Sequence, residues 1–308
     1  MNSPLARVIM SVLAGYLILL LLLTVHDWYQ KEFPSPPPRT SNSKRVQHPF
    51  HHSQAIRALQ HFSRLPDTEK NAIKFHLDRV LLSTERWLAD LPRSNYKIIC
   101  LGEFHAESTR TFLAHRFFSK LPIDVLMLET TPDGLNRLIR RMKAGRRYFP
   151  LLDADIMSIL HTVTAINPDV KIFGIDETDA QQRGPHEPRG ARDKSIAGNF
   201  WSHYHPGSRH LILFGASHCA TEPNWLFSRL CNQAPLPLPD QMLNVQVLEE
   251  HQRGPLEAFV YFLDEIGLEK KDFVIADTAG LHPLIYELFP LLDRQILKKY
   301  LTLVVFRT

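Results

Sequence analysis

Carboxylate and imidazole side chains recur just after successive apolar runs of strand length. The runs are followed by Gly102-Glu103-Phe104-His105, Leu128-Glu129, Asp176-Glu177 and Gly215-Ala216-Ser217-His218. Because ligands of an open α/β sheet bind outside the carboxyl ends of its strands, these groups are predicted to meet at one edge. An imidazole beside a carboxylate suits general acid–base catalysis, and the same two groups also ligate divalent metals.

Each of these residues also has a purely structural interpretation. His105 and His218 can be loop histidines bonded to the backbone, and Glu103 and Glu129 can cap a helix or pair with a cation. A carboxylate that directly follows a buried strand is costly unless paired or coordinated, so each glutamate is expected to have a partner. Gly-x-x-His also occurs in Gly207-Ser208-Arg209-His210, which precedes its strand and is therefore a chance occurrence. The position at a strand end favours a function for the other two motifs.

The third strand end and a later helix supply further polar candidates. Only one of Asp176 and Glu177 can face the site, and Asp176 is suited to orient a ligating histidine. Asp193 is predicted to cap the amino-terminal end of its helix. Arg192, at the mouth of the site, is suited to bind an anionic substrate group or a developing oxyanion.

The three cysteines form neither a disulfide framework nor a CxxC metal motif. Cys100 lies inside an apolar run and is predicted to be a core residue. Cys219 and Cys231 are candidates to pair if the domain is exported. Cys219 beside His218, and Ser217 without a G-x-S-x-G motif, are poor candidates for a catalytic nucleophile.

The elements that must position these residues alternate between strands and amphipathic helices. Residues 53–91 have helical spacing of apolar residues and predict packing helices that precede the sheet. Near-continuous apolar strands separated by helices predict an α/β fold with a mostly parallel sheet and helices on both faces. The predicted strands cover residues 97–101, 123–128, 170–175, 210–214, 243–248, 273–276 and 301–306. The predicted helices cover residues 107–121, 135–143, 155–166, 192–204, 223–230 and 256–266.

The amino-terminal region carries an uncharged apolar run from Val8 to Val25. A helix of this length spans roughly 27 Å, about the thickness of the hydrocarbon core of a bilayer. Trp28 and Tyr29 suit the membrane interface, and Arg7 favours a cytoplasmic amino terminus. We therefore predict a single-pass membrane protein with its domain on the extracytoplasmic side: a membrane helix within residues 1–30, a Pro/Ser-rich linker over 31–49, and one α/β domain with a helical extension over 50–308.

The charge of the chain argues against a nucleic-acid partner. The 36 Lys and Arg exceed the 32 Asp and Glu by four, and the segment before Pro49 carries three of these four net charges. The remainder is close to neutral, whereas a nucleic-acid binder usually has a strongly basic face.

The strand-end motifs resemble those of a known superfamily. Gly102-Glu103-Phe104-His105, Leu128-Glu129, Ala191-Arg192-Asp193 and Gly215-Ala216-Ser217-His218 together resemble the erythromycin esterase/ChaN-like superfamily, which includes TIKI and TraB proteins. The resemblance covers about residues 96–218. It implies a hydrolase in the esterase and TIKI branches, with Glu103, His105, Glu129 and His218 as the active set, and a haem-binding protein in the ChaN branch. The chain departs from the ChaN branch in lacking a lipobox cysteine.

The leading functional hypothesis is a membrane-anchored hydrolase that cleaves an ester or amide bond of a small-molecule or peptide substrate. His105, Glu129 and His218 would hold zinc or manganese, and Glu103 would be the general base. A metal-free variant, in which histidine and glutamate activate water directly, stays open. The alternatives are a haem- or iron-compound-binding protein without turnover and a non-catalytic anchored module.

Overall fold

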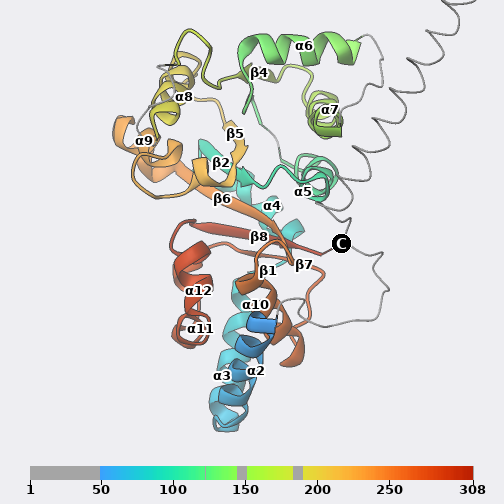
Figure 1. Cartoon of the computed structure of the whole chain (residues 1–308), viewed down its shortest axis with the longest axis vertical. Helices are drawn as coiled ribbons and strands as arrows, with labels where there is room; N and C mark the ends of the chain where they lie inside the picture. The colour runs from blue at the N-terminus through green and yellow to red at the C-terminus, as the bar shows by residue number, and fades with distance from the viewer. Residues whose placement is uncertain (1–48, 122, 144–150, 183–189, 308) are drawn as a thin grey trace, which may run out of the picture. The chain divides into compact units, whose positions relative to one another are not determined.

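An eight-stranded sheet organises the residues that the structure describes (Figure 1). The computed structural model describes residues 49–121, 123–143, 151–182 and 190–307. These residues belong to the second of two compact units, residues 45–308. The strand order is β1-β7-β8-β6-β2-β5-β3-β4. The strands are β1 (Leu81–Leu82), β2 (Ile98–Glu103), β3 (Val125–Leu128), β4 (Lys171–Gly174), β5 (His210–Gly215), β6 (Met242–Glu249), β7 (Asp272–Ile275) and β8 (Thr302–Phe306).

The strands form because their apolar residues are covered on both faces. Every residue of β2, β3 and β5 is buried. Strand β2 pairs in parallel with β5 on one side and β6 on the other, and β5 pairs in parallel with β3. The register aligns Glu103 with Gly215, so the strand ends carrying Glu103 and His218 are neighbours.

Helices cover the two faces of the sheet and form two separate cores. One face packs against α4 (Thr84–Asp90), α5 (Glu107–Phe112), α6 (Pro132–Lys143) and α7 (Leu151–Ile166). The other face packs against α2 (Pro49–Ser63), α3 (Asp67–Val80), α8 (Ala191–Ser202), α9 (Leu226–Gln233), α10 (Gly254–Glu265), α11 (Pro283–Leu288) and α12 (Pro290–Leu292). The short helical turns are η1 (Leu91–Arg93), η2 (Leu113–Phe117), η3 (Ala216–Cys219), η4 (Leu238–Gln241), η5 (Thr278–Gly280) and η6 (Asp293–Leu297).

The α/β prediction is confirmed, and the sheet is mixed in one place. Strand β7 pairs antiparallel with both β8 and β1. The reason is positional: β7 begins at the edge where β8 ends, since Asp272 pairs with Phe306, and it therefore runs back across the sheet. Strand β1, at residues 81–82, also interrupts the stretch that was predicted to be helical.

The predicted localisation requires a correction. Among residues 49–121, 123–143, 151–182 and 190–307, no helix combines the length and apolar character needed to cross a bilayer. The predicted span, residues 8–25, lies outside the described residues. We therefore withdraw the single-pass membrane localisation.

Candidate functional site

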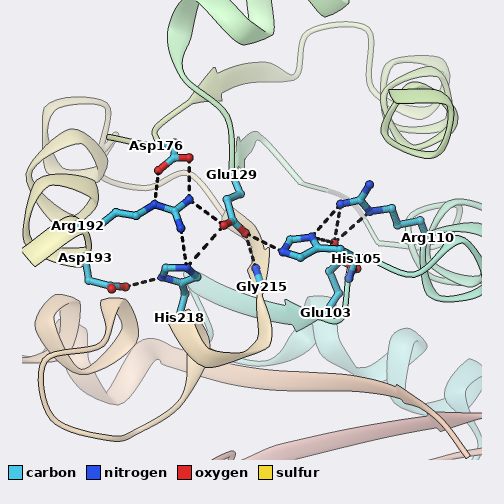
Figure 2. A network of polar contacts seen from close by, with 9 residues as sticks. All are labelled: Glu103, His105, Arg110, Glu129, Asp176, Arg192, Asp193, Gly215 and His218. Atoms are coloured by element: carbon cyan, nitrogen blue, oxygen red, sulfur yellow. Dashed lines mark hydrogen bonds and ion pairs between the residues drawn. The ribbon is translucent and has the colours of Figure 1, made fainter. Parts of the chain in front are cut away.

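Glu103 and His105 form the first half of a polar network at the carboxyl end of β2 (Figure 2). Glu103 closes the strand, and its side chain is only 1% exposed. The next turn brings His105 into the left-handed region, with φ of 51°. This conformation is uncommon for a residue with a side chain and often marks functional sites. It turns His105 back on Glu103, so that Nδ1 lies 2.8 Å from Oε1 and the backbone N–H also donates to the carboxylate.

Arg110 on α5 is the charged partner of Glu103. Its Nε and Nη2 donate to Oε1 of Glu103, both at 3.0 Å, and the Arg110 side chain is 8% exposed. The hydrogen bond to Glu103 raises the pKa of His105 above its ordinary value, although burial and the charge of Arg110 oppose the rise. Burial opposes ionisation of Glu103, but the bond from His105 and the charge of Arg110 outweigh it and lower its pKa. Glu103 is therefore an anion that increases the basicity of His105.

Glu129, directly after β3, stands at the centre of the network (Figure 2). Its Oε2 accepts the Gly215 backbone N–H at 2.6 Å and lies 3.4 Å from Nε2 of His105. Its Oε1 lies 3.6 Å from Nε2 of His218. A Cβ on Gly215 would lie 2.9 Å from Nε2 of His105, so this close approach requires a glycine.

Arg192 joins Glu129 to the end of β4. Its Nε and Nη2 donate to the two carboxylate oxygens of Asp176 at 2.9 and 2.7 Å, and Nη2 also donates to Oε1 of Glu129 at 2.8 Å. The hydrogen bonds that Arg192 donates to Asp176 raise the pKa of Arg192 above its ordinary value. Nη1 lies 3.4 Å from Nε2 of His218. Of the two adjacent acids, Asp176 therefore joins the network, while Glu177 is buried without a hydrogen bond to Oε1.

His218 forms the second half of the network from η3. Its Nδ1 lies 2.6 Å from Oδ1 of Asp193, whose side chain is only 2% exposed. The same oxygen accepts the Leu226 backbone N–H at 2.9 Å. The prediction that Asp193 caps its helix is wrong, because α8 begins at Ala191 after Gly190. The Asp193 carboxylate instead fixes the orientation of His218.

A disulfide between Cys100 and Cys219 joins β2 to η3, with the two Cα atoms 5.5 Å apart. The predicted pairing of Cys219 with Cys231 is therefore wrong, and Cys231 is a free, half-buried thiol. Strand β2 and η3 lie close enough for the disulfide because Gly102 lacks a side chain: a Cβ there would lie 3.0 Å from the Cα of Ala216. The residue before Cys219 is His218, so the covalent link also helps to position the imidazole.

The predicted metal ligands lie together, but their donor atoms have other partners. Both oxygens of Glu129 accept hydrogen bonds, from Gly215 and from Arg192. A cation bound between the two imidazoles would also lie beside the Arg192 guanidinium, which is unfavourable. Among the described residues, no group of three His, Cys, Asp or Glu is arranged to hold a metal. These residues do not fit zinc or manganese as arranged, and ligation by His105, Glu129 and His218 stays a prediction.

The sequence alone predicted most residues of this network but not the roles of Arg110 and Asp193. The structure brings together the five predicted site residues, which are Glu103, His105, Glu129, Arg192 and His218. It adds Arg110, which was not considered, and the bond from Asp193 to His218. A signal for Arg110 existed, because a carboxylate ending a buried strand needs a cation and α5 is the next element.

Comparisons with known proteins find distant similarity to solved structures. No family model and no curated protein matches the sequence. The chain is similar to a Bacillus cereus protein of known crystal structure, with 10% identity, a TM-score of 0.49, and coverage of 77% of this chain and 97% of that one. It is also similar to the C-terminal region of Pasteurella multocida toxin, for which a thiol-protease-like catalytic triad is described (11% identity, TM-score 0.37, 65% of this chain).

A third similar structure is RRSP, a MARTX toxin effector domain from Vibrio vulnificus, with 13% identity, a TM-score of 0.32 and coverage of 56% of this chain. The chain spans only 30% and 40% of the two toxin chains. At these identities and scores the similarities carry no functional conclusion. The resemblance to the erythromycin esterase/ChaN-like superfamily stays a prediction.

Proposed function

We propose that the protein is a hydrolase that cleaves an ester or amide bond by general acid–base catalysis at the His105–Glu129–His218 network. One observation carries the proposal. Two histidines from different strand ends direct Nε2 toward the same carboxylate, Glu129, at 3.4 and 3.6 Å. The Nδ1 of each ring faces a different carboxylate, Glu103 for His105 and Asp193 for His218. A carboxylate at Nδ1 fixes the orientation of each ring, and at His105 it also raises the pKa of the imidazole, as a general base requires.

His105 is the stronger candidate for the base. Its side chain is 45% exposed, whereas that of His218 is 10% exposed, so water and substrate reach His105 more readily. In the proposed step, Nε2 of His105 takes a proton from water while the water oxygen attacks the substrate carbonyl carbon. The imidazolium is stabilised by Glu103 at Nδ1 and by Glu129 near Nε2. The same proton then passes to the leaving alkoxide or amine as the acyl bond breaks.

Arg192 is the proposed electrostatic partner of the oxyanion. Its Nε and Nη2 are held by Asp176 and Glu129, which fixes the guanidinium plane. Its side chain is 41% exposed, and Nη1 faces His218 at 3.4 Å. A fixed cationic donor at this place is suited to stabilise negative charge that develops on the carbonyl oxygen.

The proposed function is tested with purified protein and a panel of chromogenic esters and anilides. We expect His105→Ala to lower kcat/KM by about 100-fold or more, the range for loss of a general base. His218→Ala is expected to lower it less, because that imidazole is more buried. His161→Ala is the matched control, since His161 is an exposed histidine on α7. Hydrolysis that persists unchanged in both site variants refutes the proposal.

Haem binding and metal dependence stay predictions, and each has its own test. Haem or iron-compound binding is tested by adding haem and comparing the Soret band of the wild type with that of His105→Ala. Metal dependence is tested by chelator sensitivity in the same ester assay.

A further inference from the structure

The loop between β6 and α10 carries an exposed arginine that lies against the residue before His105. The guanidinium carbon of Arg253 lies 4.6 Å from the centre of the Phe104 ring. Arg253 is exposed, while Phe104 is half-buried and packs on the core. A planar cation over an aromatic face is attracted to it and loses much of its rotational freedom. Arg253 is therefore held beside the turn that carries His105.

The positive charge of Arg253 also acts on a residue that is bonded to the η3 side of the site. The hydroxyl of Tyr300 donates to the carbonyl of Ala216 at 2.6 Å, two residues before His218. Burial raises the pKa of Tyr300, and the positive charge of Arg253 opposes this rise. Arg253 is thus in contact with the residue before His105, and its charge acts on the tyrosine that bonds to η3.

The acidic residues around Arg253 in the chain are committed to other partners. Glu250 pairs with His251 at 3.0 Å and with Arg307 at 3.1 Å, and Glu257 pairs with His251 at 2.9 Å. Glu249 accepts the hydroxyl of Ser108 at 2.8 Å. Within the described part of the chain, no carboxylate forms an ion pair with the guanidinium of Arg253. Its donors face solvent and are available to a ligand.

Arg253 supplies a positive charge that no carboxylate of the network balances. Arg110 is paired with Glu103, and Arg192 with Asp176 and Glu129, so both guanidinium groups are already balanced by carboxylates. A permanently charged anionic group of the substrate therefore gains less from the centre of the network, where Arg192 serves the oxyanion that develops during the reaction. It gains more from Arg253, whose fork of N–H donors matches a carboxylate or a phosphate.

We propose that Arg253, held on Phe104, is a specificity-determining residue that binds an oxyanion of the substrate, a carboxylate or a phosphate, while His105 attacks the ester or amide bond. This inference rests on the proposed function and names the substrate class. It does not assign Arg253 a part in the bond cleavage itself.

The test compares a neutral ester with two anionic esters. The substrates are the 4-nitrophenyl esters of butyric acid, of succinic acid as its monoester, and of phosphoglycolic acid. We expect Arg253→Ala to raise KM for the ester of the preferred anion by about tenfold, as expected for one charge-assisted contact at an exposed site. KM for the butyrate ester is expected to change less than twofold. Arg253→Lys is expected to restore part of the effect, and the larger of the two anion effects identifies the source as carboxylate or phosphate.

The matched control is Arg79→Ala, because Arg79 lies over the Phe75 ring at 5.6 Å on α3. It removes an exposed arginine from an aromatic face without touching the network. A rise in KM that is equal for neutral and anionic esters in Arg253→Ala, or equal in Arg79→Ala, overturns the proposed subsite while leaving the hydrolase proposal intact.

A binding measurement separates the two proposals if no ester is hydrolysed. Succinic acid monoanilide and butyranilide are titrated into the wild type and Arg253→Ala, with binding followed by ligand-observed NMR. Selective binding of the monoanilide that is lost in Arg253→Ala supports the anion subsite even without turnover. Equal binding of both anilides overturns it.

Discussion

The buried pair of Arg110 and Glu103 yields the most discriminating prediction about the network. Their side chains are 8% and 1% exposed, and two N–H donors of Arg110 reach Oε1 of Glu103 at 3.0 Å. Removing one member of a buried ion pair leaves the other charge uncompensated, at a cost of about 3–5 kcal/mol. In Arg110→Met, Glu103 keeps its contacts with His105, so we expect the free energy of unfolding to fall by about 3 kcal/mol, the lower end of this range. For a chain of this size that lowers Tm by roughly 6–12 °C.

Substitutions of the two members of this pair should move the pKa of His105 in opposite directions. Glu103→Gln removes the hydrogen bond that is the main cause of its raised pKa, so the pKa falls. Arg110→Met removes a positive charge that opposes the rise, so the pKa increases. The acid limb of the pH dependence of kcat/KM is expected to follow these shifts, because only neutral His105 accepts a proton.

Two measurements check this reasoning. Urea unfolding gives the free energy of unfolding of each variant, and NMR titration of the His105 imidazole gives its pKa. Arg116→Met is the control, because the Arg116 side chain is 47% exposed and lies 4.0 Å from Asp272, a contact worth less than about 1 kcal/mol. Shifts of the His105 pKa in the same direction in both variants, or a loss of stability no larger than in Arg116→Met, would refute the reasoning.

Three further predictions concern His251, the disulfide and Gly215. The pKa of His251 is raised to about 9 by its bonds to Glu250 and Glu257. The stability that these bonds contribute is therefore full below pH 6.5, the ordinary pKa, and is lost as the pH rises through about 9; the loss is at most about 3 kcal/mol. In His251→Gln, the urea midpoints at pH 6 and pH 9.5 should differ less than they do in the wild type. The bond between Cys100 and Cys219 closes a loop with a sequence separation of 119, so the double alanine variant should lose about 2–5 kcal/mol in urea unfolding, whereas Cys231→Ala should unfold almost as the wild type does. Gly215→Ala introduces a Cβ that would lie 2.9 Å from Nε2 of His105. Because the flexible imidazole moves away, the rate of hydrolysis should fall about tenfold or more with little change in Tm. Wild-type activity in this variant contradicts the proposed position of His105.

The sequence was sufficient to group the strand ends but not to identify their partners. Glu103, Glu129 and His218 lie one to four residues after apolar runs, and adjacent parallel strands deliver such residues to one edge. Strands β2, β5, β3 and β4 are consecutive in the sheet, so the four predicted strand ends meet. This order depends on tertiary packing, which the local apolar pattern does not encode.

The errors have the same physical origin. Asp193 is a residue type that often caps helices. It bonds to His218 because η3 packs beside the start of α8, which the local sequence does not reveal. Cys100 reads as a core residue, which it is, yet its disulfide partner comes from a segment 119 residues away. The antiparallel direction of β7 is equally invisible in its short apolar run, because strand direction follows from how the chain returns to the sheet.

The position of β2 has a consequence for synthesis of the chain. Both neighbours of β2 are distant in sequence, since β5 begins at His210 and β6 at Met242. A ribosome adding about 5–20 residues per second needs on the order of ten seconds between the emergence of β2 and that of β5. During this interval the apolar strand has two open edges, which favour intermolecular association. The nascent polypeptide is therefore a predicted client of ribosome-associated chaperones.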